Sequence, residues 1–97
     1  MARSVIERKL SEVTSRLRAL RDELAIADEQ LAALAEEADD ARLRALVSET
    51  PIAEHEHNEA QKHADAMARH RAKVLEELTE LERTQDDLLD RLIAQSR

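Results

Sequence analysis

The sequence of 97 residues has no glycine, no cysteine and no aromatic residue, and Pro51 is its single proline. Without cysteine the chain has no disulfide, no thiolate metal ligand and no thiol nucleophile. A chain with so few helix breakers, and with 38% charged residues, has the composition of long helices and not of a mixed globular domain. We therefore expect an all-α protein.

The charge and hydropathy pattern excludes several classes of partner. The net charge is −7, which argues against a general binder of nucleic acid or of anionic membranes. Residues 1–4 are followed by alternating charges and not by an apolar segment, so we expect no signal peptide. No apolar run approaches the length of a membrane span. We expect a cytoplasmic protein that acts away from membranes.

Apolar residues recur with alternating spacings of four and three in the first half of the chain. This is a heptad repeat, in which positions a and d form one stripe along a helix. It predicts one helix over about residues 3–47, with Ser4 as its N-cap and Glu7 completing a capping box. The members of this first heptad series are Ile6, Leu10, Val13, Leu17, Leu20, Leu24, Ala27, Leu31, Leu34, Ala38, Ala41 and Ala45.

The segment Ser48-Glu49-Thr50-Pro51 is the one break signal. Proline cannot continue a helix interior, whereas threonine is a good N-cap and proline a good first helical residue. We predict a turn at 48–50 and a second helix over about 51–95. Its heptad series is Ala53, His57, Ala60, Ala64, Met67, Arg71, Val74, Leu78, Leu81, Gln85, Leu88 and Leu92.

The two series match each other when the chain folds back at the turn. If the residue numbers of facing partners add up to 98, every member of one series faces a member of the other, as in Leu17–Leu81 and Leu20–Leu78. Charges support this orientation, because residues 22–40 contain eight acidic and no basic side chains and would face four basic residues within 58–76. The sequence predicts a single antiparallel coiled-coil hairpin over residues 1–97; the alternative is an open form in which the helices separate at Pro51 and pair between chains, as in a domain-swapped dimer. Near the turn, Arg42 and Arg44 are expected to meet acidic residues of the second helix, Glu54 and Glu56.

Two polar residues stand at a positions of the second helix, Arg71 and Gln85. Polar residues at a positions fix register and partner at a cost in stability. We interpret both as register-setting residues, and we expect Asp28 to lie near Arg71.

The four histidines, His55, His57, His63 and His70, all belong to the second helix. A carboxylate-bridged dimetal site needs Glu-x-x-His motifs from two helices, and the first helix has no histidine. We therefore expect no metal site and no cofactor. Only His57 belongs to a heptad series, and its protonation at about pH 6 is expected to loosen the hairpin near the turn.

Apolar residues outside the heptad series suggest contacts with another chain. They are Leu75, Leu89 and Ile93 on the second helix and Ile26 on the first. A two-helix hairpin leaves half of each helix uncovered, so these residues are expected to bind a second hairpin, giving a homodimer or four-helix bundle, or to dock on a larger protein complex.

A further apolar group, Leu43, Leu46, Val47 and Ile52, lies on both sides of the turn. We predict that it forms a hydrophobic plug that closes the end of the hairpin. The alternative is a tip that docks on another molecule, flanked by Glu49 and Glu54.

Catalysis has little support, because the serines and threonines are isolated and no glycine-rich phosphate loop is present. We predict a non-enzymatic structural or protein–protein interaction module without a small-molecule substrate. A long hairpin with Glu49 and Glu54 near its turn also resembles the coiled-coil domain of the transcription factors that enter the secondary channel of RNA polymerase. That resemblance implies a regulatory finger with an acidic tip, although the globular domain that anchors such fingers has no counterpart in these 97 residues.

Overall fold

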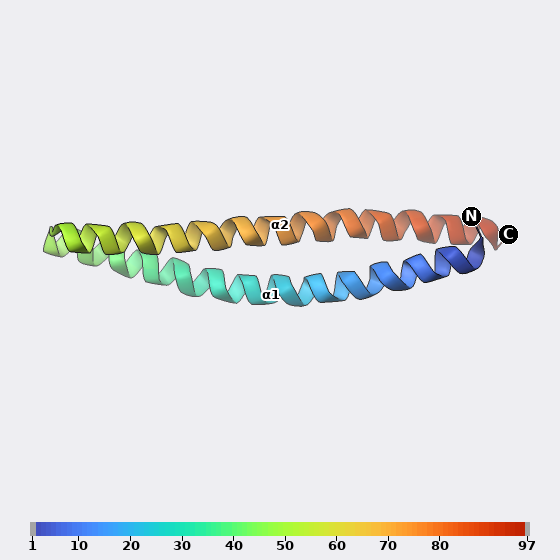
Figure 1. Ribbon diagram of the computed structural model, residues 1–97, viewed down its shortest axis with the longest axis horizontal. Helices are drawn as coiled ribbons and strands as arrows, with labels where there is room; N and C mark the ends of the chain where they lie inside the picture. The colour runs from blue at the N-terminus through green and yellow to red at the C-terminus, as the bar shows by residue number, and fades with distance from the viewer. Residues whose placement is uncertain (1, 97) are drawn as a thin grey trace. The chain divides into compact units, whose positions relative to one another are not determined.

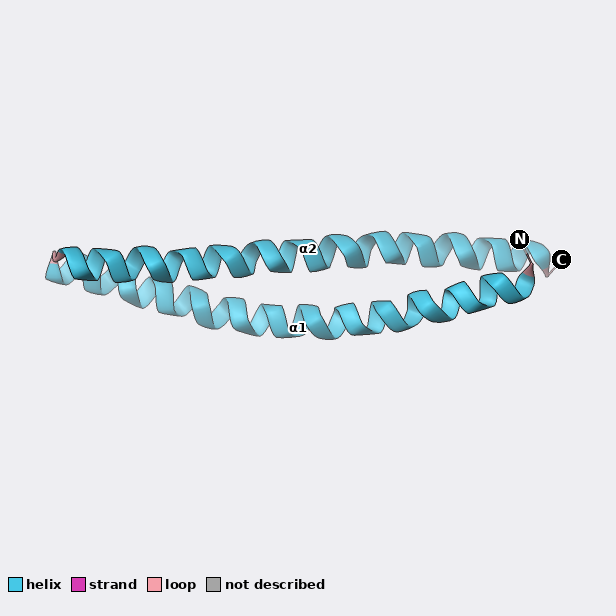
Figure 2. Ribbon diagram, viewed as in Figure 1, coloured by secondary structure: helices cyan, strands magenta, loops and turns pink. Residues whose placement is uncertain are grey.

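The computed structural model describes residues 2–96 and is all-α. Helix α1 (Arg3–Ser48) and helix α2 (Pro51–Gln95) are joined by Glu49 and Thr50. The two helices pack against each other in opposite directions, as the predicted antiparallel hairpin requires (Figures 1 and 2).

The hairpin consists of two compact units, and both helices contribute to each. One, here called the terminal unit, comprises Met1–Leu24 and Val74–Arg97. The other, the turn unit, comprises Ala25–Lys73. In both units every member of the two heptad series is buried or half-buried.

The terminal unit has a core of large aliphatic side chains. Ile6, Leu17 and Leu20 are fully buried, and each such side chain contributes about 2 kcal/mol of hydrophobic stabilisation. The central cluster contains both members of the predicted facing pairs Leu17–Leu81, Leu20–Leu78 and Leu24–Val74, which agrees with the register inferred from the sequence.

The turn unit has a thinner core, because alanine occupies most of its buried positions. Leu31, Leu34 and Met67 are only half-buried. Each alanine lacks about 2 kcal/mol of burial free energy relative to leucine, since it has three fewer carbons. The buried alanines are Ala27, Ala38, Ala41, Ala45, Ala53 and Ala64.

The turn itself depends on two backbone-capping arrangements. Glu49 adopts a left-handed conformation, with φ of 51°, and its N–H donates to the carbonyl oxygen of Ala45 at 3.1 Å. This is the αL helix end in which glycine is usual. Thr50 caps α2 as predicted, because its Oγ1 accepts a hydrogen bond from the N–H of Ala53 at 3.2 Å. Helix α1 ends at Ser48, one residue later than the sequence suggested.

The predicted cap at the start of α1 is wrong. The helix begins at Arg3, so Ser4 lies inside its first turn. The carbonyl oxygen of Ala2 accepts hydrogen bonds from the N–H groups of Val5 and Ile6, at 3.1 and 3.2 Å. The carboxylate of Glu7 binds Arg3 at 2.9 Å instead of completing a capping box. Since nothing in the sequence prevents helical geometry before Ser4, the helix begins on the N-terminal side of this residue, at Arg3.

The left-handed conformation of Glu49 generates a stability prediction. A residue with a Cβ atom is disfavoured there, so Glu49→Gly should stabilise the fold by about 1 kcal/mol and raise the melting temperature by roughly 4–8 °C. Thermal unfolding followed by circular dichroism measures this. Ser48→Gly is the matched control: it places glycine at a helical residue and removes the 2.6 Å hydrogen bond to the Arg44 carbonyl, so its melting temperature should fall. An unchanged or lower value for Glu49→Gly would contradict the explanation.

Candidate protein interaction surface

The two facing heptad series form the interhelical seam. Outside this seam, large apolar side chains are exposed in both units. They include the four residues predicted to contact a partner, Leu75, Leu89, Ile93 and Ile26. The others lie beside the turn and are Leu43, Leu46, Val47 and Ile52. Scattered exposed leucines are ordinary on protein surfaces, so what matters is how these residues are grouped.

The first group is a line along α2 in the terminal unit, formed by Leu75, Leu89 and Ile93 and here called the α2 line. Leu75 and Leu89 are each about two-fifths exposed, at 40% and 41%. Glu82 stands one heptad from both leucines and pairs with Arg21 of α1 at 3.8 Å. The α2 line thus has an acidic residue, Glu82, at its centre, and Arg21 of α1 pairs with it. Ile26 belongs to the turn unit and is not part of it.

The second group is the tip patch, made of Leu43, Leu46, Val47 and Ile52. The plug predicted from these residues is wrong, because all four are exposed, Val47 to 86% and Ile52 to 69%. The seam next to the turn is already filled by Ala45 and Ala53, which are buried. Because the four large side chains fall between the a and d positions of their helices, helical periodicity turns them away from the facing helix.

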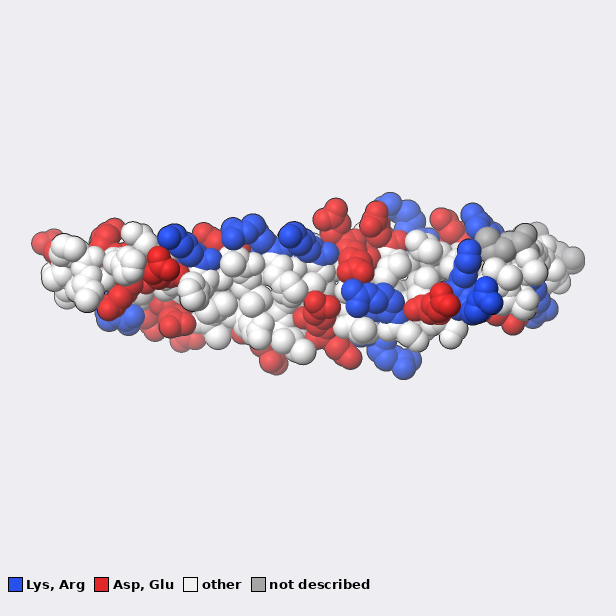
Figure 3. Space-filling model, viewed as in Figure 1, with Lys and Arg blue, Asp and Glu red and all other residues white. Residues whose placement is uncertain are grey.

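An open depression beside the turn brings Leu46 of the tip patch together with two carboxylates. Leu46 lines it together with Glu49 and Glu54, the two acidic residues that the sequence placed at the tip. Glu54 lies in the first turn of α2, where the helix dipole favours a negative charge. Figure 3 shows predominantly uncharged surface around the turn, on the left of the view, with acidic atoms beside it. The complete lining is Ala45, Leu46, Glu49, Thr50, Pro51 and Glu54.

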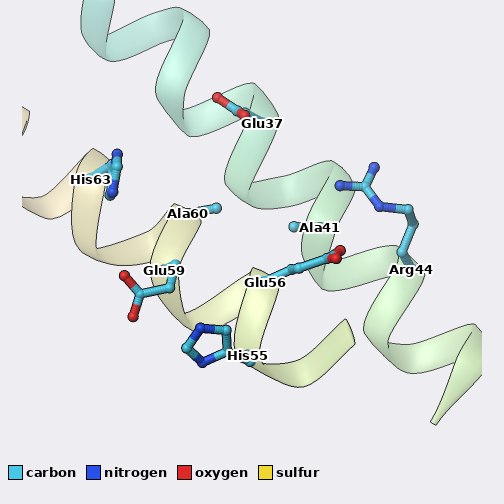
Figure 4. A pocket seen from close by; sticks show the side chains of 8 residues that line it. All are labelled: Glu37, Ala41, Arg44, His55, Glu56, Glu59, Ala60 and His63. Atoms are coloured by element: carbon cyan, nitrogen blue, oxygen red, sulfur yellow. The ribbon is translucent and has the colours of Figure 1, made fainter. Parts of the chain in front are cut away.

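The histidine-bearing part of α2 borders a separate open pocket (Figure 4). Glu37 and Arg44 reach it from α1, and His55, Glu56 and His63 reach it from α2. Among residues 2–96, no three His, Cys, Asp or Glu side chains are grouped so that they could hold a metal ion. His57, which the sequence placed on the seam, is half-buried there.

The expected meeting of basic and acidic side chains near the turn is found only in part. Arg44 and Glu56 line the same pocket. Arg42 instead pairs with Asp39 on its own helix, at 3.3 Å. A partner one turn away on the same helix is always within reach of arginine, so the intrahelical pair forms without help from the facing helix.

Both polar a-position residues bind side chains of α1. The Arg71 guanidinium pairs with Asp28, as expected, and remains half-exposed. The amide of Gln85 donates a hydrogen bond to Thr14 Oγ1 at 3.3 Å. These contacts occupy seam positions that leucine would fill with apolar surface, which fits the predicted role in setting register.

One cross-helix ion pair in the terminal unit supports the antiparallel orientation that the charge pattern indicated. The guanidinium of Arg16 donates to both carboxylate oxygens of Glu77, at 3.0 and 3.2 Å. Both side chains are about half exposed, so the pair contributes only a few tenths of a kcal/mol. Its main effect is on helix orientation and pairing.

No protein-family model matches the chain, and neither a curated protein nor a solved structure matches it. Within residues 2–96, neither helix has an apolar stretch suited to crossing a membrane. The chemistry of the α2 line and of the tip patch is therefore the basis for a functional assignment.

The polar residue on the seam at Gln85 yields a prediction about stability. Gln85→Leu should raise the free energy of unfolding by about 1 kcal/mol, because it buries additional apolar surface, while Thr14 is exposed and can bind water instead. The midpoint of urea unfolding measures the change. Gln30→Leu, at an exposed position, is the control and should change stability by less than about 0.5 kcal/mol. Equal effects of the two substitutions would contradict the assigned role of Gln85.

The open pocket of Figure 4 is also lined by Glu59, a carboxylate with a shifted pKa. A hydrogen bond from Lys62 to Glu59, at 3.2 Å, and the positive charge of that lysine lower the pKa of Glu59, with smaller contributions from His55 and His63. A lowered folded-state pKa stabilises the fold above the ordinary carboxyl pKa, and this effect is lost as the pH falls through the folded-state value. Lys62→Met should therefore raise the pKa of Glu59, measured by an NMR titration. Lys73→Met is the control, and a Glu59 pKa that does not move in Lys62→Met would refute the assignment.

Proposed function

We propose that the protein is a non-enzymatic interaction module that binds other protein chains through the outer surface of its helical hairpin. The observation that carries this proposal is the contrast between a filled seam and exposed large apolar residues elsewhere. The heptad series satisfy each other within one chain, whereas the α2 line and the tip patch have large apolar side chains that remain exposed within residues 2–96. Grouped exposed apolar residues of this kind are typical of interaction sites.

The α2 line supports self-association. Leu75 and Leu89 stand one heptad on either side of Glu82. If a two-fold axis passes near Glu82, Leu75 of one copy packs on Leu89 of the second copy, and the reverse contact follows by symmetry. The two Glu82 carboxylates then meet near the axis, where the Arg21 of each chain, 3.8 Å from its own Glu82, offsets their repulsion. The resulting dimer is an antiparallel four-helix arrangement.

The exposed tip favours a second candidate function. Glu49, Glu54 and the tip patch are all exposed at the turn, which is the arrangement expected of a finger that inserts its end into a larger assembly. This candidate and self-association use different surfaces, because the α2 line belongs to the terminal unit and the tip patch to the turn unit.

Solution mass tests self-association. Multi-angle light scattering over a concentration series should give a mass that rises toward that of a dimer, with helicity followed by circular dichroism. The triple variant Leu75→Glu, Leu89→Glu, Ile93→Glu should remain monomeric with unchanged helicity, because it places charges on the surface that the second copy covers.

A triple variant with the same added charge on other exposed positions, Ser15→Glu, Gln30→Glu and Ala33→Glu, is the control and should still form dimers. A wild-type protein that stays monomeric at every concentration would reject self-association. So would an α2-line variant whose mass equals that of the wild type.

A further inference from the structure

We infer that the tip patch is the docking surface for a different protein, whose matching site combines an apolar depression with lysine or arginine side chains at its border. This inference rests on the proposed interaction function and names the chemistry of one partner. It concerns the turn unit alone and does not depend on self-association through the α2 line.

The apolar part of the argument is the concentration of exposed side chains. All four members of the tip patch fall within residues 43–52, and they are more exposed than Leu75 or Leu89. The buried alanines of the nearby seam leave no room for them between the helices. Because none of the described residues 2–96 covers them, a partner with apolar side chains gains most by burying this end of the hairpin.

The backbone at Glu49 is the second observation. Its φ of 51° is a conformation in which glycine is favoured and glutamate is not. An unfavourable conformation of this kind is often retained at a functional position. Here it holds the residue at the turn, where Glu49 lines the same depression as Leu46 and Glu54.

Charge decides between the candidate occupants. Residues 43–56 contain three glutamates, Glu49, Glu54 and Glu56, against one arginine, Arg44. A second copy brought tip to tip would place like charges together, and an anionic membrane surface would also be repelled. Lysine and arginine match both the apolar surface and the negative charge of the tip, because their aliphatic stems cover apolar surface while their charged ends pair with carboxylates. An arginine in the depression would pack its stem on Leu46 and Pro51 and pair with Glu49 and Glu54.

A synthetic amphipathic helical peptide of leucine and arginine is the probe, and a second peptide with glutamine in place of arginine is its neutral counterpart. Fluorescence anisotropy with the full-length protein measures binding at several salt concentrations. We expect the basic peptide to bind the wild type at least about tenfold more tightly than it binds Val47→Ser/Ile52→Ser or Glu49→Gln/Glu54→Gln, with weaker binding at high salt. Leu75→Ser/Leu89→Ser is the matched control outside the tip and should bind like the wild type. Circular dichroism verifies that each variant is folded.

The outcomes separate this inference from the proposed function. Equal binding of the peptide to the tip variants and the wild type, or equal binding of the neutral and basic peptides, would overturn the inference, and so would no binding at all. A tip variant that alters the solution mass would assign the tip to a second copy, and binding to zwitterionic vesicles that is lost in Val47→Ser would assign it to lipid. A monomeric wild type that binds the basic peptide through the tip would reject self-association and leave the tip inference standing.

Discussion

The whole structure depends on the mutual burial of two apolar stripes. Each helix carries a heptad series that would be exposed to water on an isolated helix, and the matching series of the other helix covers it. The single proline places the reversal midway between the two series, so the covering helix comes from the same chain. Ion pairs such as Arg16–Glu77 then reinforce an orientation that the apolar contacts already require.

The composition of the seam differs between the two units, and this difference has consequences outside the seam. In the terminal unit, leucine, isoleucine and valine fill the core. In the turn unit, alanine fills it, and the larger residues Leu46, Val47 and Ile52 occupy outer positions. Apolar surface that would stabilise the hairpin is therefore displaced to its outside near the turn.

The two exposed surfaces have different chemistry. On the α2 line, partly covered leucines lie on both sides of an acidic residue that already has a basic neighbour, Arg21. At the tip, fully projecting side chains such as Val47 lie close to carboxylates of the turn. Self-association through the α2 line and docking of a basic, apolar partner on the tip patch are therefore proposed for surfaces of different units.

The sequence by itself determined the two helices, the position of the turn, the Thr50 cap and the pairing register, because heptad spacing and proline act through local backbone geometry that does not depend on distant residues. Only the tertiary structure decided that the tip patch is exposed, that Arg42 pairs within its own helix, that Ser4 is not the cap of α1 and that Glu49 takes a left-handed conformation. Burial depends on what lies opposite a side chain, and a periodic pattern does not specify this for residues outside the pattern. Leu46, Val47 and Ile52 stay outside because they fall between the a and d positions of their helices, while Ala45 and Ala53 fill the space between the helices beside them.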